Sequence, residues 1–251
     1  MRILILLLVL ISTTTLAQGK SKQKHIQIVT EDWPPFNYAL PNGQIGGISS
    51  VKVKQIFAMA DIPYTITLHP WLKAFEQAKN NQNVMIYSIL RSKEREDQFK
   101  WICPLTQPVT LFYFSLSHRD DIDLVSLRDI DQYTIGVTAS EYSHHFLQKK
   151  ISKDDSNIRM SNSSPDNLQK LLTGEVDIII ETLPSIKLRL KAVGKDYSAV
   201  KSIIEVRNDD ISPNCMAFGL KTSDEIVERV RRALLRLNAQ QAAKYNDTNH
   251  L

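Results

Sequence analysis

The sequence lacks several features that would point to particular classes of protein. No second long apolar stretch follows the first residues, so the chain from residue 18 onward is expected to be soluble. Lysine and arginine form no basic block with interleaved aromatic residues, and the net charge of +4 falls to +3 without Arg2. A nucleic-acid partner is therefore not expected. Low-complexity segments and obvious repeats are also absent.

Cysteine and metal-ligand patterns are scarce as well. The chain has two cysteines, Cys103 and Cys215. They can pair in an oxidising compartment or remain buried thiols, and their spacing does not decide between these alternatives. The six histidines show no metal-ligand spacing, since His144 and His145 are adjacent and neighbours on a helix point in different directions. We predict no metal and no cofactor.

Residues 1–17 have the pattern of a secretory signal peptide. A positively charged start precedes the apolar run Ile3–Ile11, and Thr15 and Ala17 occupy the −3 and −1 positions for cleavage before Gln18. The run is about half the length of a membrane-spanning helix, which makes an uncleaved anchor the weaker alternative. No lipobox cysteine follows it. The pattern predicts export to the periplasm.

Predicted strands and helices alternate along the rest of the chain. Residues 25–29 alternate apolar and polar side chains, and residues 176–180 are almost continuously apolar, as in a strand buried on both faces. The alternation predicts an α/β fold with parallel sheets. Further strands are expected at 64–68, 84–89, 111–114, 134–137 and 215–220, and helices after Ser49–Ser50, from Trp71, from Glu141, around Leu168–Leu172 and from a capping box at Thr222 and Glu225.

The segment 84–104 carries an ordered motif. Its strand leads to Ser92; Arg95 follows three residues later and Trp101 six residues after that, opening a short strand that ends at Pro104. This order resembles family 3 of the bacterial extracellular solute-binding proteins, which serve polar amino-acid ABC importers. Further matches in the same order are the aromatic-Pro-Phe loop at 32–36, the strand at 135–137, the Gly-x-Val-Asp turn at 174–177 and the C-terminal helix from Thr222.

The resemblance covers nearly the whole mature chain and implies a type II periplasmic-binding-protein fold. Two mixed sheets flanked by helices would form two lobes joined by two crossing hinge strands. Lobe 1 would hold residues 18–115 and 221–251, and lobe 2 residues 116–220. The family also implies a monomer that captures a small amino-acid-like carboxylate and delivers it to an inner-membrane ABC permease.

Candidate ligand-binding residues in the first lobe centre on Arg95. A guanidinium offers two parallel N–H donors to a carboxylate, and the family places this role at Arg95. Ser88 and Ser92 are expected to add donors. Without the resemblance, Arg95 would belong to a solvated run of charges. Arg91 either binds an acidic group of the ligand or pairs with Glu94.

Aromatic side chains are expected to wall the cleft, because they bury apolar parts of a ligand and exclude water. The candidates are Trp33, Phe36 and Trp71. Phe36 and Trp71 fit the core of the lobe equally well.

In the second lobe, Thr138–Ser140 is expected to offer backbone N–H groups to the ligand carboxylate at a helix N-terminus. The chain departs from the family here, because Ser140, Glu141 and Tyr142 stand where a glycine and a threonine are common. The family's amine-binding aspartate is also missing: its position is Thr182, and Glu181 lies one residue earlier. The ligand amine contact therefore stays open between these two.

A solute-binding protein is the leading interpretation, and two alternatives accompany it. Some family members are cyclohexadienyl or arogenate dehydratases, a reaction that needs a general acid, for which Glu141, Glu181 or His144 is available. The other alternative is a stand-alone sensor for a partner receptor. The identity of the ligand is not contained in the sequence.

Overall fold

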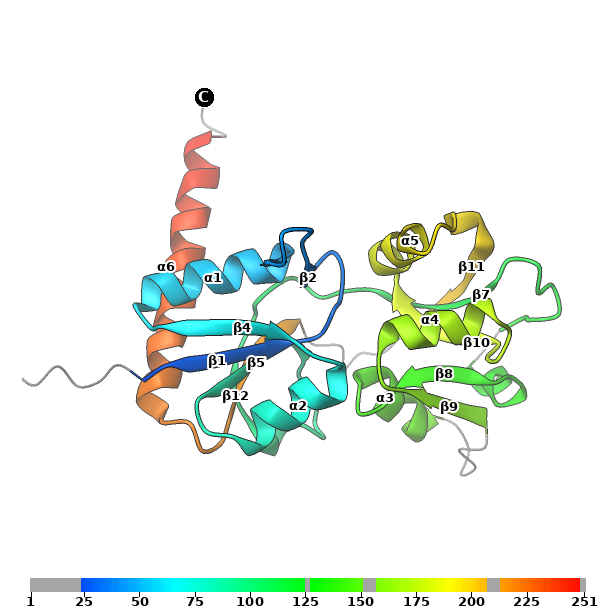
Figure 1. The fold of residues 1–251 in the computed structure, drawn as a ribbon, viewed down its shortest axis with the longest axis horizontal. Coiled ribbons are helices and arrows are strands. Elements are labelled where there is room, and N and C mark those ends of the chain that lie inside the picture. Colours follow the sequence, from blue (N-terminus) through cyan, green and yellow to red (C-terminus); the bar gives the residue numbers. More distant parts are fainter. Residues whose placement is uncertain (1–23, 125–126, 151–156, 207–212, 249–251) are drawn as a thin grey trace, which may run out of the picture.

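The computed structural model describes residues 24–124, 127–150, 157–206 and 213–248, so the expected signal peptide lies outside the described residues. Two five-stranded sheets organise these residues into two lobes (Figure 1). Each sheet is mixed and carries helices on both faces, as expected from the sequence.

The sheet of the first lobe has the strand order β4-β1-β5-β12-β6. These strands are β4 (Tyr64–Leu68), β1 (Ile26–Thr30), β5 (Val84–Leu90), β12 (Asn214–Gly219) and β6 (Phe99–Ile102). β1 runs parallel to β4 and β5, whereas β12 runs antiparallel to β5 and β6. A small ribbon of β2 (Tyr38–Ala39) and β3 (Ile45–Gly46) lies beside it.

Apolar side chains on the two faces of this sheet pack against different helices. Ile26, Ile28 and Met85 join a core with α1 (Ile48–Ala60) and α6 (Asp224–Thr248). On the opposite face, Val29 and Ile86 pack against α2 (Trp71–Asn80). The alternation of side chains along β1 and β5 thus builds two apolar layers from one pair of strands.

The second sheet has the order β11-β7-β10-β8-β9. Its strands are β11 (Val200–Glu205), β7 (Leu111–Leu116), β10 (Ile178–Thr182), β8 (Ile135–Thr138) and β9 (Ile158–Ser161). The aromatic residues of α3 (Tyr142–Lys150) pack on one face, while α4 (Ser164–Leu172) and α5 (Leu183–Ala192) cover the other. Asp177 joins β8 to β10, because its carboxylate accepts hydrogen bonds from the backbone N–H and hydroxyl of Thr134. The Gly-x-Val-Asp turn therefore has a structural role.

Sheet membership corrects the expected lobe boundaries at 115/116 and 220/221. β7 belongs wholly to the second sheet, so the first crossing ends before Leu111. β12 lies in the first sheet, between β5 and β6, so the return crossing ends before Asn214. The resemblance implied these boundaries, because apolar patterning marks a strand but not its partners, and the sheet order places β12 in the first lobe instead.

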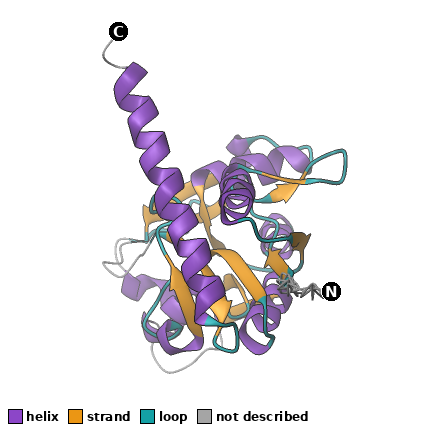
Figure 2. Cartoon of the chain, turned by 90° about the vertical axis from the view of Figure 1, so that its left-hand side faces the viewer, coloured by secondary structure: helices purple, strands orange, loops and turns teal. Residues whose placement is uncertain are grey.

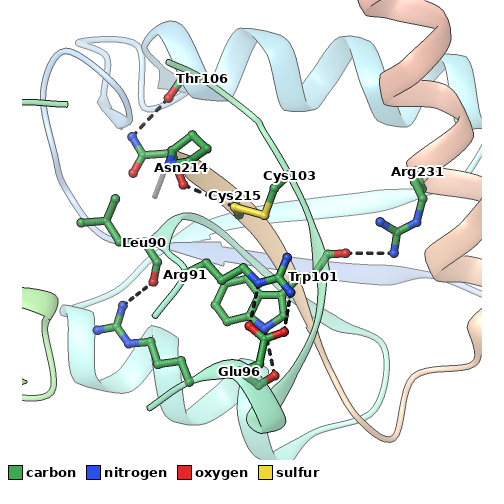
Figure 3. Close-up of a disulfide and its surroundings, with 11 residues drawn as sticks. Leu90, Arg91, Glu96, Trp101, Cys103, Thr106, Asn214, Cys215 and Arg231 are labelled. Carbon is green, nitrogen blue, oxygen red and sulfur yellow. Dashed lines mark hydrogen bonds and ion pairs between the residues drawn. A yellow bond between two sulfur atoms is a disulfide. The ribbon is translucent and has the colours of Figure 1, made fainter. Parts of the chain in front are cut away.

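A disulfide links the chain just after β6 to the start of β12, where the two crossing segments meet the first lobe (Figure 3). Cys103 follows β6 and Cys215 lies in the neighbouring strand β12, with their Cα atoms 4.6 Å apart. Beside it, the N–H of Leu105 donates to the carbonyl oxygen of Asn214 over 2.7 Å, and the Asn214 amide donates to the Thr106 hydroxyl over 3.2 Å. The pairing that spacing left open is therefore settled, and both connections meet the first lobe beside this cross-link.

Two helix starts differ from the sequence expectation. α1 begins one residue before Ser49–Ser50, after Gly47 at φ 103°, and both serines are buried inside the helix. The Ser50 hydroxyl lies 2.7 Å from that of Tyr87 and forms a hydrogen bond with it, so it does not cap the helix. The Thr222 hydroxyl accepts from the backbone N–H of Asn83 instead of closing the expected box at the start of α6. Tertiary partners have outcompeted local capping at both sites.

Only the first half of the C-terminal helix α6 packs against the first lobe. Its first turns cover the first sheet through Val230, Ala233, Leu234 and Leu237. Residues 239–246 are exposed, and the C-terminal part of the helix projects away from both lobes (Figure 2). None of the helices in the described ranges combines the length and apolar character of a membrane span.

Candidate functional site

A small cavity lies between the two lobes, at the carboxyl ends of β1, β5 and β10. Open α/β sheets bind ligands at this edge. Its volume is about 30 Å³, enough for one or two water molecules. The first lobe contributes Glu31, Trp33, Trp71, Ser88, Leu90 and Arg95 to its lining, and Leu111, Glu141, Tyr142, Ser143, Ile180 and Glu181 complete it.

Arg95 is the central cation of the cavity. Only 1% of its surface is exposed, and its guanidinium stacks 5.3 Å from the Trp71 ring centroid and 5.5 Å from that of Phe75. Nη1 donates to the carbonyl oxygen of Leu90 and Nη2 to that of Ser140, each over 2.8 Å. Burial lowers the pKa of Arg95 to about 10, an effect that Glu141 and Glu31 partly offset. The guanidinium is therefore charged at neutral pH.

Ser88 faces the cavity because β5 contains a bulge at this residue. Cys215 of β12 pairs with Ile89 and Met216 pairs with Tyr87, which leaves Ser88 without a partner in the register. Its φ of 59° is a left-handed conformation that few residues other than glycine adopt. The extra residue moves Ile89 to the α2 face of the sheet, the face opposite to Tyr87. Bulges redirect side chains in this way beside functional sites.

Three buried hydrogen-bond donors in the lining of the cavity lack a partner within the described part of the chain. They are Nε of Arg95, Nε1 of Trp71 and the hydroxyl of Ser88, and all three residues line the cavity. An unpaired buried donor costs about 1–3 kcal/mol, so such groups are rare and usually have a missing partner. A ligand oxygen would supply one.

Two carboxyl groups in the cavity have raised pKa values. Burial raises the pKa of Glu31 well above its ordinary value; the neighbouring Glu141 adds to this, whereas Arg189 opposes it. Burial raises the pKa of Glu141 to about 7, and the charge of Glu181 contributes in the same direction. Glu31 lies directly after β1 in the first lobe, and Glu141 precedes α3 in the second.

Direct contacts between the lobes hold the cavity closed. Nε1 of Trp33 donates to Oε1 of Glu181 over 3.2 Å. Arg189 of α5 donates to the carbonyl oxygen of Asp32 over 2.6 Å, while its Nε lies 3.4 Å from Oε2 of Glu181. The Arg95–Ser140 hydrogen bond adds to these, and the structure therefore represents a closed conformation.

Five of the ten predicted ligand-binding residues meet in this cavity: Arg95, Ser88, Trp33, Trp71 and Glu181. Phe36 packs behind Trp33, with ring centroids 4.5 Å apart, and lines a separate cavity of about 540 Å³ near the crossing segment. Thr182 caps α5 by accepting from the N–H of Ser185. Its neighbour Glu181 is thus the residue that reaches the cleft.

The other three predicted residues lie around Arg95 without lining the cavity. Arg91 donates to the Glu96 carboxylate and stacks over Trp101 (Figure 3). The carbonyl oxygen of Ser92 accepts from the N–H of Arg95. Ser140 contributes the carbonyl oxygen that receives Nη2 of Arg95.

The backbone N–H groups expected to meet a ligand carboxylate in the second lobe are occupied. The N–H of Ala139 donates to the carbonyl oxygen of Ser161, and that of Ser140 donates to Nδ1 of His144. Ser140 adopts φ 59°, and α3 starts only at Tyr142. In this closed conformation these two N–H groups are thus paired within the protein, and the anion site at 138–140 stays a prediction.

Sequence reasoning missed Glu31 and Arg189 and considered Glu141 only as a catalytic acid. A signal was present for the two glutamates, because each follows a predicted strand, at 25–29 and 134–137, and the carboxyl ends of strands form the binding edge. Arg189 lies within a helix and had no comparable signal. Within the described ranges, no cluster of three His, Cys, Asp or Glu residues is arranged to hold a metal.

Comparison with known proteins identifies the family. The profile described as bacterial extracellular solute-binding proteins, family 3, matches residues 26–248. A search of curated proteins by sequence found no match. The match spans most of the chain, so the chain belongs to this family of solute-binding proteins.

Solved structures share the fold at low sequence identity. An ancestral arginine-binding protein bound to arginine is 18% identical, with a TM-score of 0.72 over 86% of this chain and 92% of that one. The arginine-, lysine-, histidine-binding protein of Geobacillus stearothermophilus is 19% identical, with a TM-score of 0.71 over 89% and 93%. A histidine kinase sensor domain similar to periplasmic binding proteins is 16% identical, with a TM-score of 0.74 over 90% and 96%. The periplasmic-binding-protein fold is thereby established.

Proposed function

We propose that this family 3 chain is a periplasmic solute-binding protein that captures a small amino acid between its lobes for import by an ABC permease. The observation that carries the proposal is the group of unpaired donors at Arg95, Trp71 and Ser88. A ligand carboxylate on Arg95 would satisfy them together, because a charged acceptor forms the strongest hydrogen bonds with such donors.

The lobes must separate before a solute can enter the cavity. The closed cavity of about 30 Å³ is far below the roughly 300 Å³ or more of a typical ligand pocket. Opening would break the contacts of Trp33, Arg95 and Arg189 across the cleft. Reclosure around a solute would restore some of them, and the closed form is what a permease would receive.

Calorimetric titration of the mature protein with the twenty amino acids tests the proposal. We expect saturable binding of one molecule per chain for at least one of them, without chemical conversion. The absence of heat with every amino acid would contradict it.

A dehydratase is the second candidate, and one observation favours it. The pKa of Glu141 is raised to about 7 in the closed cavity, so this carboxyl group is suited to donating a proton at neutral pH. Incubation with prephenate or arogenate separates the two functions. Consumption of either substrate that disappears in Glu141→Gln would assign the enzyme activity, whereas amino-acid binding without consumption supports capture alone.

A further inference from the structure

Carboxylates outnumber cations around the closed cavity. Glu31, Glu141 and Glu181 line it, and Arg95 is the one cationic side chain in the lining. If all are ionised, the lining carries a net charge of −2. Arg189 behind Glu181 adds one positive charge and Asp32, 3.3 Å from Arg189, adds one negative charge, so the excess stays at −2. Burying uncompensated charge is costly, so this arrangement requires a cation or protons in the cavity.

Glu181 already has its partners. Its carboxylate accepts from the Trp33 indole over 3.2 Å and from the Thr182 N–H over 2.8 Å. Nε of Arg189 lies 3.4 Å away. This carboxylate is therefore part of the closure contacts, which leaves the other two to meet a ligand.

Glu31 and Glu141 retain most of their capacity to accept hydrogen bonds. Within the described residues, the Glu141 carboxylate accepts only from the Ser143 hydroxyl, over 3.1 Å, and the Glu31 carboxylate accepts none. The two residues come from opposite lobes and face the same cavity. An ammonium group carries three donors and a positive charge, so it fits between two such carboxylates.

We propose that Glu31 and Glu141 form a clamp that holds a ligand ammonium between the lobes, so that the site selects solutes of net positive charge. This proposal rests on the proposed function and names the class of solute. A zwitterion brings no net charge and leaves this excess in place. A cationic amino acid reduces the excess by one charge, with its carboxylate on Arg95 and its ammonium on the clamp.

Protons take the place of the cation when the closed cavity is empty. Glu141 faces Glu181 of β10, Arg95 of the β5–β6 connection and Arg189 of α5. Glu31 faces Glu141, Glu181 and Arg189. Asp32 lies next to it in the chain and adds a further negative charge. The negative charges favour protonation of the clamp, in line with the raised pKa values. Binding of an ammonium group near pH 7 is therefore expected to release a proton.

Matched ligand pairs and matched variants test the clamp by calorimetric titration. Arginine with citrulline and lysine with norleucine differ mainly in the side-chain charge, and glutamate adds a negative charge. We expect the cationic member of each pair to bind more tightly and glutamate to bind most weakly. Glu31→Gln and Glu141→Gln should each weaken cation binding by about tenfold to hundredfold, the cost of losing a charged hydrogen bond.

Glu76→Gln is the matched control, because Glu76 lies on α2 outside the cavity and bonds to Asn80. It should bind like the wild type. Titrations in phosphate and Tris buffers should differ in heat for the wild type, through proton release, and differ less for Glu141→Gln. Circular dichroism melts verify that each variant is folded.

The outcomes separate the clamp from the proposed function. Equal binding of charged and neutral partners, or wild-type affinity in both glutamate variants, would overturn the clamp and leave amino-acid capture intact. If neither these five amino acids nor any other natural amino acid binds, the clamp and the proposed function are both overturned.

Discussion

Nη2 of Arg95 in the first lobe donates to the backbone carbonyl oxygen of Ser140 in the second lobe over 2.8 Å. The side chain that would anchor a ligand carboxylate is thus also a closure contact. The same guanidinium keeps Nε unpaired toward the cavity. Ligand capture and lobe closure therefore share one residue, and substitutions around the cleft are expected to affect both.

Trp33→Phe tests the contribution of the hydrogen bond between Trp33 and Glu181 to closure. The substitution keeps an aromatic wall but removes the indole N–H. A lost hydrogen bond to a charged group costs about 1.5–3 kcal/mol, so ligand affinity should fall by about tenfold or more. Titration calorimetry measures this, with Trp101→Phe as the control, because Trp101 lies outside the cavity and donates to the Glu96 carbonyl. Unchanged affinity in Trp33→Phe would show that this contact does not stabilise the bound state.

Stability should depend on pH through Glu141. Its pKa is raised from an ordinary 4.5 to about 7, so the folded protein binds more protons than the unfolded chain between these values. Stability contributed by this group is fully present below pH 4.5 and is lost as the pH rises through 7. Glu141→Gln removes the effect.

We therefore expect the ligand-free Glu141→Gln variant to melt at a higher temperature than the wild type at pH 8 and at the same temperature at pH 4.5. Thermal melts across this range, monitored by circular dichroism, provide the measurement. A constant difference at all pH values would rule out titration of Glu141 as its source.

Loss of the disulfide should destabilise the protein. Cys103 and Cys215 are separated by 112 residues, and closing a loop of this length stabilises the folded state by about 4–5 kcal/mol in the chain-entropy account. The double variant Cys103→Ser, Cys215→Ser is expected to lose about 2–5 kcal/mol of unfolding free energy in urea. Dithiothreitol should lower the stability of the wild type to a similar extent and leave the variant unchanged. Equal stability of both proteins without reductant would contradict this expectation.

Much of the first-lobe site was predictable because it depends on local order along the chain. Arg95 follows strand β5 at the family spacing, and Trp33 lies in a proline-rich loop directly after β1. Positions at strand ends reach the binding edge in any sheet of this type. Glu181 also reached the cleft, although its place one residue before the family position argued against it.

The remaining features depend on contacts that no local pattern contains. The orientation of Ser88 follows from a bulge opposite Cys215 and Met216, which requires the partner strand β12 to be known. The Glu31–Glu141 pair exists only because the lobes close over each other. Similarly, Ser140 was expected to offer its N–H, but the bond to His144 leaves only its carbonyl oxygen for Arg95.

The most direct test of amino-acid capture is a titration of wild-type protein and Arg95→Ala with the tightest-binding amino acid. The variant leaves the ligand carboxylate unpaired in a desolvated cleft, so affinity should fall by at least about a hundredfold, with Arg236→Ala on the exposed face of α6 as the control. Circular dichroism confirms that both variants are folded. Binding by the wild type and the control, but not by Arg95→Ala, is the predicted result. Equal affinity in all three proteins would contradict the central claim.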